Sequence, residues 1–398
     1  MVAWILGVIL FALGICISVA LHEAGHMGAA KMFGMRVRRY FIGFGPTLWS
    51  FRRGETEYGL KAIPAGGFCD IAGMTALDEV TPDEAPRAMW RYPTWKRFVV
   101  MVAGSVTHFI LGFLILYVMA ITMGLPNTEP VRPEIASVNQ CVVDKGNTSE
   151  DGCAPGAPAP AKDAGLREGD LVLSVDGTPT PTWGEMVAKV EGLSGPAEFE
   201  VRRGGEVLTL TVDVARVSAP NGEQAGAIGV SVALPPAMIG YGPLDAVGGT
   251  VSFTGDMFVG VWNGLLDIPE KVPAVIEAIG GGERDPNTPV SVVGASIIGG
   301  DAVEQGIWEM FVLLLATLNF FIGVFNLLPL LPLDGGHIAV LFYEKVRDWL
   351  RRLRGKPAGG PVDYTKLSAV TMVFVVIGGA FMLLTLTADI VNPIRIGQ

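Results

Sequence analysis

The stretch VAWILGVILFALGICISVALHEAGH, residues 2–26, decides the fold. Its first twenty residues carry no charge, which is the length an α-helix needs to cross the hydrocarbon core of a membrane. A cleaved signal peptide would have a basic region before its apolar run, and none precedes this one. The stretch therefore predicts a membrane-spanning helix that ends in a cluster of ionisable side chains.

The rest of the chain is similarly apolar. Half of its 398 residues are hydrophobic, 17% are charged, and the mean hydropathy is +0.45, which soluble proteins rarely reach. Three further runs, Val99–Leu125, Ile307–Leu333 and Leu367–Ile390, are long enough to span a bilayer. We predict a polytopic α-helical membrane protein with about four transmembrane helices. A pI near 5.0 argues against nucleic acid as a partner.

The charges of the connecting segments predict the orientation. Lysine and arginine are concentrated in Lys31–Arg91 and Lys345–Lys366, whereas aspartate and glutamate dominate the segment between the second and third spans. Basic loops remain in the cytosol, so both termini and the central segment are expected to be extracytoplasmic. Glu344–Arg354 is basic and amphipathic, and it predicts a helix on the cytosolic membrane surface.

The segment after the first span has the pattern of β-structure. Strand-like runs at 37–42, 47–51 and 56–61, with a turn at 53–54, predict a β-hairpin. Such a hairpin either dips into the membrane, sheltered against the helices because its backbone cannot face lipid unpaired, or lies in the cytosol.

The central segment predicts a soluble α+β domain. Ala164–Asp170 leads into a strand at 171–175, followed by a helix at 183–190 and strands at 197–202 and 207–213. This order resembles bacterial PDZ domains, which capture an extended peptide or chain end by strand addition. A β-rich spacer without a ligand is the alternative.

Two smaller features of this region leave their structure or role open. Cys141 and Cys153 flank a polar loop, and they form either a disulfide, if that loop faces an oxidising compartment, or two free thiols. Residues 237–301 are Gly-rich, and they are expected to contain amphipathic helices on the outer membrane face and a strand at 290–293.

The sharpest chemical signal is the pair His22 and His26 with Glu23 between them. Positions i and i+4 of a helix lie on one face, so both imidazoles can bind one zinc ion. Glu23 can then serve as a general base toward water. The alternative without a metal site is a pair of interfacial histidines beside a glutamate. Ionisable groups at the end of a spanning helix are energetically costly, however, unless they have a function.

A catalytic zinc ion needs a third protein ligand and one open position. The candidate is Asp334 in the segment Asn326–Gly336, NLLPLLPLDGG, where two prolines must break the helix. Gly335 and Gly336 are expected to form a tight turn around the carboxylate.

These motifs, in this order, resemble the site-2 protease family of intramembrane metalloproteases, in its bacterial branch with a single PDZ-like domain that acts in regulated intramembrane proteolysis. The resemblance implies Zn²⁺ held by His22, His26 and Asp334, with Glu23 as the base and Asn326 supporting the substrate or the transition state. It also implies a location in the bacterial cytoplasmic (inner) membrane. Substrates would be single-pass membrane proteins such as anti-sigma factors after a first extracytoplasmic cut, and remnant signal peptides are a second class. The PDZ-like domain would bind a peptide or chain end of the trimmed substrate.

The chain departs from the family at one motif. The family's G-P-x-x-N reads Gly104-Ser105-Val106-Thr107-His108 here. His108 could donate a hydrogen bond as asparagine does, act as an auxiliary ligand, or make a structural hydrogen bond. His337 is expected to have a structural or ligand-supporting role. The hairpin after the first span is a possible partner strand for an extended substrate, and Thr56–Lys61 is the segment in which proline substitutions would test this.

Two other classes of function compete with an intramembrane zinc metalloprotease. A non-catalytic PDZ-type membrane adaptor would keep a structural metal site, and a transporter would also place polar groups in broken helices. All four residues that the chemistry requires are present, and no inverted repeat is evident.

The predicted organisation has eight parts. They are the first span with the zinc motif (1–34), the hairpin region (35–95), the second span (96–125), the extracytoplasmic PDZ-like domain (126–220), the extracytoplasmic connector (221–306), the broken third span (307–343), the cytosolic basic segment (344–366), and the fourth span with the C-terminus (367–398).

Overall fold

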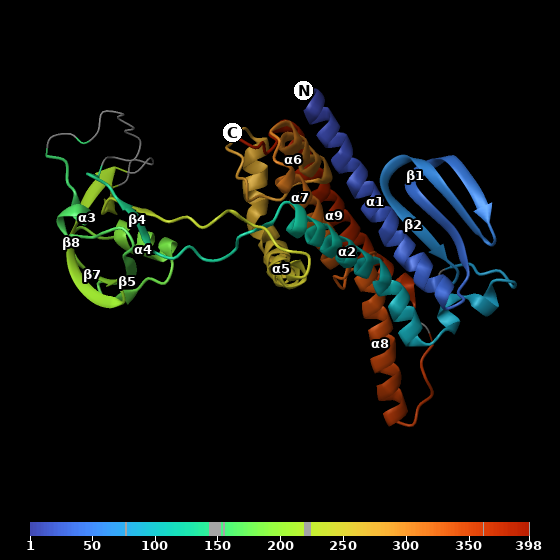
Figure 1. The fold of residues 1–398 in the computed structure, drawn as a ribbon. Coiled ribbons are helices and arrows are strands. Elements are labelled where there is room, and N and C mark those ends of the chain that lie inside the picture. Colours follow the sequence, from blue (N-terminus) through green and yellow to red (C-terminus); the bar gives the residue numbers. More distant parts are fainter. Residues whose placement is uncertain (76–77, 143–152, 154–155, 219–223, 361, 398) are drawn as a thin grey trace. The chain divides into compact units, whose positions relative to one another are not determined.

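The computed structural model describes the chain except residues 76–77, 143–152, 154–155, 219–223, 361 and 398. It divides into two compact units, which are described separately. The first unit comprises Met1–Leu125 and Gly240–Gln398, and the second comprises Pro126–Ile239. Figure 1 labels the elements of both units.

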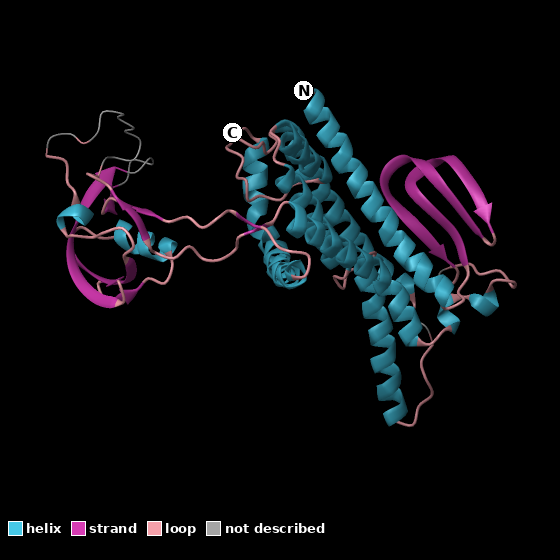
Figure 2. Ribbon diagram, in the orientation of Figure 1, coloured by secondary structure: helices cyan, strands magenta, loops and turns pink. Residues whose placement is uncertain are grey.

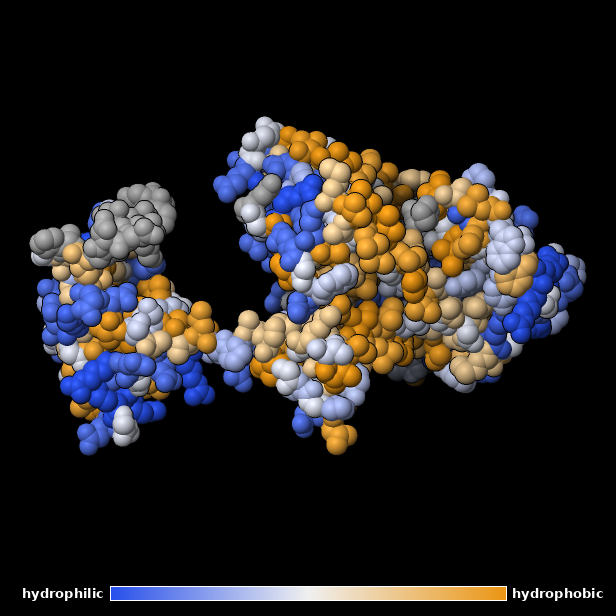
Figure 3. Space-filling view, turned by 45° about the horizontal axis from the view of Figure 1, so that its top comes forward, coloured by the Kyte–Doolittle hydropathy of each residue, from blue (hydrophilic) through white to orange (hydrophobic). Residues whose placement is uncertain are grey.

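Four helices of the first unit are long and apolar enough to cross a membrane, among the residues described. They are α1 (Val2–Met32), α2 (Thr94–Thr122), α7 (Trp308–Asn326) and α9 (Tyr364–Val391, apolar from Leu367). Hydrophobic residues cover much of the helical surface visible in Figure 3. The prediction of about four transmembrane helices is confirmed.

Three further helices complete this unit: α5 (Asp245–Ile279), α6 (Val292–Glu304) and α8 (Asp334–Leu353). The strand expected at 290–293 is wrong, because the Ser291 hydroxyl accepts a hydrogen bond from the Gly294 amide and caps the start of α6. Small residues then let α6 pack closely on α1, since a Cβ at Gly300 would lie 2.6 Å from Val8 Cγ2. Helix packing overrides the β preference of the valines.

The hairpin consists of β1 (Val37–Arg53) and β2 (Thr56–Ile71), and it packs beside α1 (Figure 2). Both strands bend back on themselves at register shifts. Gly59 therefore lies opposite both Phe41 and Ser50, while Phe68 lies on the other side of Phe41. The hairpin therefore forms a small sheet of four strand segments, in the order 67–71, 37–42, 57–60 and 47–53.

This sheet has two edges, formed by residues 67–71 and by residues 47–53. The segment Thr56–Lys61 lies inside the sheet with a neighbour on each side. A strand with both hydrogen-bonding edges occupied cannot accept another chain, so only the two edges of the hairpin are open to a further strand.

A polar cluster anchors the base of the hairpin to the loop that precedes α2, where the short helices η1 (Ala85–Arg87) and η2 (Met89–Arg91) lie. The Arg38 guanidinium donates to both carboxylate oxygens of Glu84, at 2.9 and 2.8 Å, and to Asp78 at 2.9 Å. This hydrogen bonding lowers the pKa of Glu84 to about 2. Arg87 binds Glu55 in the same region.

The second unit is built on a five-stranded sheet in the order β6-β5-β7-β8-β9. Phe199 and Val201 of β7 are fully buried in its core, against Met186 of α4. Cys141 and Cys153 are joined by a disulfide, so the first of the two alternatives holds. The elements are β3 (Leu125–Pro126), β4 (Ile135–Val138), α3 (Pro160–Asp163), β5 (Leu171–Val175), β6 (Thr178–Pro179), α4 (Trp183–Glu191), β7 (Gly195–Arg203), β8 (Glu206–Ser218), β9 (Gln224–Ala227), β10 (Val230–Val232) and β11 (Met238–Ile239).

Candidate metal centre

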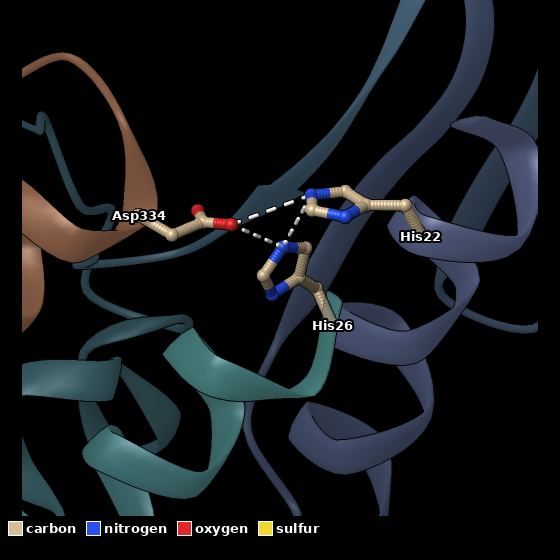
Figure 4. Close-up of side chains that lie close together, drawn as sticks. All are labelled: His22, His26 and Asp334. Carbon is tan, nitrogen blue, oxygen red and sulfur yellow. Dashed lines mark hydrogen bonds and ion pairs between the residues drawn. The ribbon is translucent and has the colours of Figure 1, made fainter. Parts of the chain in front are cut away.

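Three side chains from distant parts of the sequence meet inside the first unit (Figure 4). Oδ2 of Asp334 lies 3.3 Å from Nε2 of His22 and 3.2 Å from Nε2 of His26, and the two nitrogens are 3.2 Å apart. Both histidines are buried, and Asp334 is largely so. Among the described residues, this is the group of histidine, cysteine and acidic side chains whose geometry could hold a metal ion.

Helix α1 sets the spacing of the two histidines, and α2 fixes the ring of one. His22 and His26 are one turn apart, so their rings leave the helix on the same face. Nδ1 of His26 lies 2.7 Å from the carbonyl oxygen of Val100. A carbonyl can only accept, so Nδ1 carries the proton and Nε2 presents a lone pair to Asp334.

Asp334 is placed by the break between two helices. Helix α7 ends at Asn326, and α8 begins at Asp334 after the two prolines. The tight turn expected at Gly335 and Gly336 is not formed, because both glycines lie in the first turn of α8. Their role is close approach: a Cβ on Gly336 would lie 2.5 Å from the backbone nitrogen of Leu331.

The donor geometry fits zinc. Nitrogen and oxygen ligands at about 2.0–2.1 Å from a tetrahedral zinc ion lie about 3.3–3.4 Å apart. The three donor–donor distances are 3.2, 3.3 and 3.2 Å. Lone pairs of His26 and Asp334 that face each other at this distance repel unless a cation lies between them. The set also leaves a fourth tetrahedral position without a protein ligand, as catalytic zinc sites do.

Glu23 lies on the side of α1 that faces the hairpin. A Cβ on Gly67 of β2 would come within 3.2 Å of Glu23 Cγ, so the glycine lets the strand pass close to this carboxylate. The edge of the sheet formed by residues 67–71 therefore runs past Glu23.

Helix α2 covers another side of the cluster. A Cβ on Gly104 would lie 2.7 Å from Nε2 of His22 and closer still to Nε2 of His26. One turn later, the ring of His108 lies 5.0 Å from the ring of His22, centroid to centroid. His108 is not among the donors of the cluster, which comprises His22, His26 and Asp334.

The remaining candidate residues lie around this centre. Asn326 is the last residue of α7 and is half-buried. His337 lies in the first turn of α8. The sequence interpretation missed Asn319, which is 1% exposed and contacts His108, and it missed the close approach of Gly104. An amide within an apolar span was the available signal for Asn319.

Spanning helices, a buried three-donor cluster and an adjacent glutamate define an intramembrane metalloprotease. The chain belongs to Peptidase family M50, whose sequence profile matches residues 10–382. It is a multi-pass membrane protein and an intramembrane zinc metalloprotease of the site-2 protease type, with zinc as its cofactor.

Relatives match the chain over most of its length. The zinc metalloprotease Rip1 of Mycolicibacterium smegmatis is 49% identical over 99% of both chains. Rip1 of Mycobacterium tuberculosis is 48% identical over 99% of this chain and all of its own. The chloroplastic membrane metalloprotease ARASP of Arabidopsis thaliana is 28% identical over 83% of this chain and 68% of its own.

One solved structure resembles part of the chain. The PDZ domain of an SdrC-like protein from Listeria monocytogenes covers 26% of this chain and 93% of its own, at 15% identity and a TM-score of 0.18. That score is too low to assign the fold of the second unit.

Proposed function

We propose that His22, His26 and Asp334 hold the catalytic zinc ion and that Glu23 is the general base. The observation that carries this assignment is the mutual spacing of the three donor atoms, 3.2–3.3 Å, which matches tetrahedral ligation. Glu23 follows His22 directly on α1, within reach of a water molecule at the cluster.

Each residue then has a defined task in peptide hydrolysis. Zinc supplies Lewis acidity that makes water nucleophilic near neutral pH and polarises the scissile carbonyl. Glu23 removes a proton from the attacking water and returns it to the departing amine. Asn326, at the end of α7, supports the substrate backbone or the charge that develops on the carbonyl oxygen.

The substrate is proposed to pair with the edge of the hairpin formed by residues 67–71. This edge passes beside Glu23, whereas the opposite edge, residues 47–53, is the far side of the sheet. Strand addition would extend a substrate helix locally, and a peptide bond must be exposed in this way before it can be cut.

Cys69 offers a direct test of this pairing. In a Glu23→Ala, Cys16→Ser background, a single-pass reporter with a cysteine near its scissile bond should form a disulfide with Cys69. In the matched variant Cys69→Ser/Ser50→Cys, the thiol lies on the far edge and crosslinking should be at least about tenfold weaker. Equal crosslinking at both positions would exclude edge pairing at 67–71.

The proposed orientation follows the basic segments, with both termini and the second unit extracytoplasmic in the bacterial cytoplasmic membrane. The substrates are single-pass membrane proteins, such as anti-sigma factors after a first extracytoplasmic cut, or remnant signal peptides. In the second unit, a cavity of about 410 Å³ lies between α4 and residues 226–230, lined by Trp183, Met186 and Val190. We assign this cavity to a PDZ-like capture of an apolar peptide or chain end.

The test of the assignment is cleavage of a single-pass reporter by the purified protein, with zinc content measured in parallel. Glu23→Ala should retain zinc and lose at least about 100-fold in cleavage rate, because general-base catalysis is removed. Glu206→Ala, at an exposed position that begins β8 in the second unit, is the matched control. Unchanged cleavage by Glu23→Ala would refute the assignment. Zinc retention without cleavage by the wild type would favour the membrane adaptor.

A further inference from the structure

A buried hydrogen bond joins α2 to α7 beside the metal cluster. Nδ1 of His108 lies 2.9 Å from Oδ1 of Asn319, and both residues are 1% exposed. The other ring nitrogen, Nε2, is buried and has no hydrogen-bond partner in the described part of the chain. Nδ1 is thus anchored, while Nε2 is unsatisfied, and the centroid of the ring lies 5.0 Å from that of His22.

The orientation of the Asn319 amide is set by its own helix. Nδ2 of Asn319 lies 2.8 Å from the carbonyl oxygen of Leu315, which can only accept a hydrogen bond. Rotating the amide would bring two oxygens together and lose this bond. Oδ1 therefore faces His108, and Nδ1 of His108 must be the donor.

This donor fixes the tautomer of the ring. A neutral imidazole has one N–H, so with Nδ1 protonated the Nε2 atom of His108 carries a lone pair. A second proton would place a buried positive charge beside a site that takes a divalent cation, which is electrostatically unfavourable. Nε2 of His108 is therefore a hydrogen-bond acceptor, whereas Nδ1 donates to Asn319. The bond to Asn319 is a structural hydrogen bond of the kind that the sequence left open for His108.

We propose that Asn319 is a positioning residue that holds His108 in the Nδ1–H tautomer, and that Nε2 of His108 accepts a hydrogen bond from the attacking water. Glu23 lies on the side of the metal cluster that faces the hairpin, and His108 lies on the side that α2 covers. Of the two water protons, Glu23 removes one and His108 orients the other without taking it. The proposal rests on the assigned roles of Glu23 and the three ligands.

The tautomer can be measured without catalysis. The chain has four histidines, so ¹⁵N-histidine labelling of the zinc-free full-length protein in detergent gives four rings, and His108→Asn identifies the signals of interest. We expect a protonated Nδ1 and a bare Nε2 for His108 in the wild type. Asn319→Leu should shift the ring toward the Nε2–H form. Asn319→Asp should preserve the wild-type tautomer, since a protonated carboxyl can donate to Leu315 and accept from His108. A wild-type ring protonated at Nε2 would overturn the proposal.

The zinc-loaded protein supplies the second readout. Asn319→Leu should lower kcat about 10- to 100-fold, with zinc content and KM unchanged, and Asn319→Asp should restore most of it. Thr317→Val is the matched control, since its hydroxyl bonds only to Leu313 on the same helix among the contacts described. A raised KM with unchanged kcat would place the hydrogen bond on the substrate and overturn the proposal, as would unchanged kinetics. If the wild type cleaves nothing, the assigned function fails, and the ring tautomer still decides the role of Asn319.

Discussion

Gly104 of α2 leaves the space that the imidazole rings of His22 and His26 occupy. Any side chain at this position of α2 would occupy the volume of the His22 and His26 rings. We expect Gly104→Ala to lower zinc affinity at least about tenfold, because the imidazoles must move from their ligating positions. The measurement is zinc retained after dialysis against a weak chelator.

The control for Gly104→Ala is Gly28→Ala on α1, where an added Cβ meets no atom within 4 Å. That variant should bind zinc like the wild type, since alanine is also the better helix former. Full zinc binding by Gly104→Ala would show that the two helices separate more easily than their packing implies.

Some residues of the metal cluster and its surroundings could be predicted from the sequence by their chemical type. Others could not, because they depend on how the helices pack. His22, Glu23 and His26 were recognisable as candidates because zinc-dependent peptide hydrolysis uses those side chains at helical spacing. Asp334 was recognisable because it follows two prolines that break an apolar span. Asn319 stands out in sequence only as an amide within an apolar span, and its partner His108 is known only from the contact between α2 and α7. The crowding at Gly104 likewise depends on how α1 and α2 meet, which periodicity cannot specify.

Among the elements, the hairpin is attached to the loop before α2 partly through the Arg38–Glu84 pair. The depressed pKa of Glu84 means that this pair stabilises the fold above about pH 4.5 and that the stabilisation is lost as the pH falls toward about 2. Arg38→Met should therefore lower the thermal unfolding midpoint of the zinc-free protein at pH 7. The difference from the wild type should narrow as the pH falls from about 4.5 to about 2.

Arg39→Met is the matched control for Arg38→Met. Its guanidinium also binds a carboxylate, Asp70, but the Arg39 side chain is 54% exposed and such pairs contribute little. A pH-independent difference between Arg38→Met and the wild type would show that Arg38 acts through packing instead of charge.

The elements also show where reasoning from sequence stops. The length of the apolar runs was sufficient to predict the four spanning helices. The strand-like runs of residues in 37–61 were sufficient to predict β-structure there. The doubling back of β1 and β2 depends on register shifts that leave no clear sequence signal. The start of helix α6 was predicted as a strand, because its valines favour β-structure until the cap at Ser291 and the packing on α1 are known.

On the scale of the whole molecule, the metal cluster belongs entirely to the first unit. The chain leaves that unit at Leu125 and returns at Gly240, and the Tyr241 amide bonds to the Ala120 carbonyl, so the two ends are close. Replacing residues 126–239 by a short Gly/Ser linker should leave zinc stoichiometry unchanged. Metal analysis of the purified deletion variant, with His26→Ala as a zinc-free reference, tests this; loss of zinc would contradict it.

The disulfide is a property of the second unit alone. Cys141 and Cys153 are 12 residues apart, and closing a loop of this size typically stabilises a domain by about 2–4 kcal/mol. Replacing both by serine should accelerate trypsin cleavage within residues 126–239 of the full-length protein, while zinc content stays the same. Unchanged proteolysis would show that the unit's hydrophobic core suffices without the bridge.

The order of the ligands along the chain has a consequence for biosynthesis. His22 and His26 enter the membrane first, whereas Asp334 follows about 300 residues later. At a synthesis rate of about 5–20 residues per second, this interval lasts about 15–60 s. During that time a nascent chain has two of the three proposed metal donors, so on this assignment it cannot digest the proteins beside which it is being inserted. Competence to cut arrives only when translation is nearly complete.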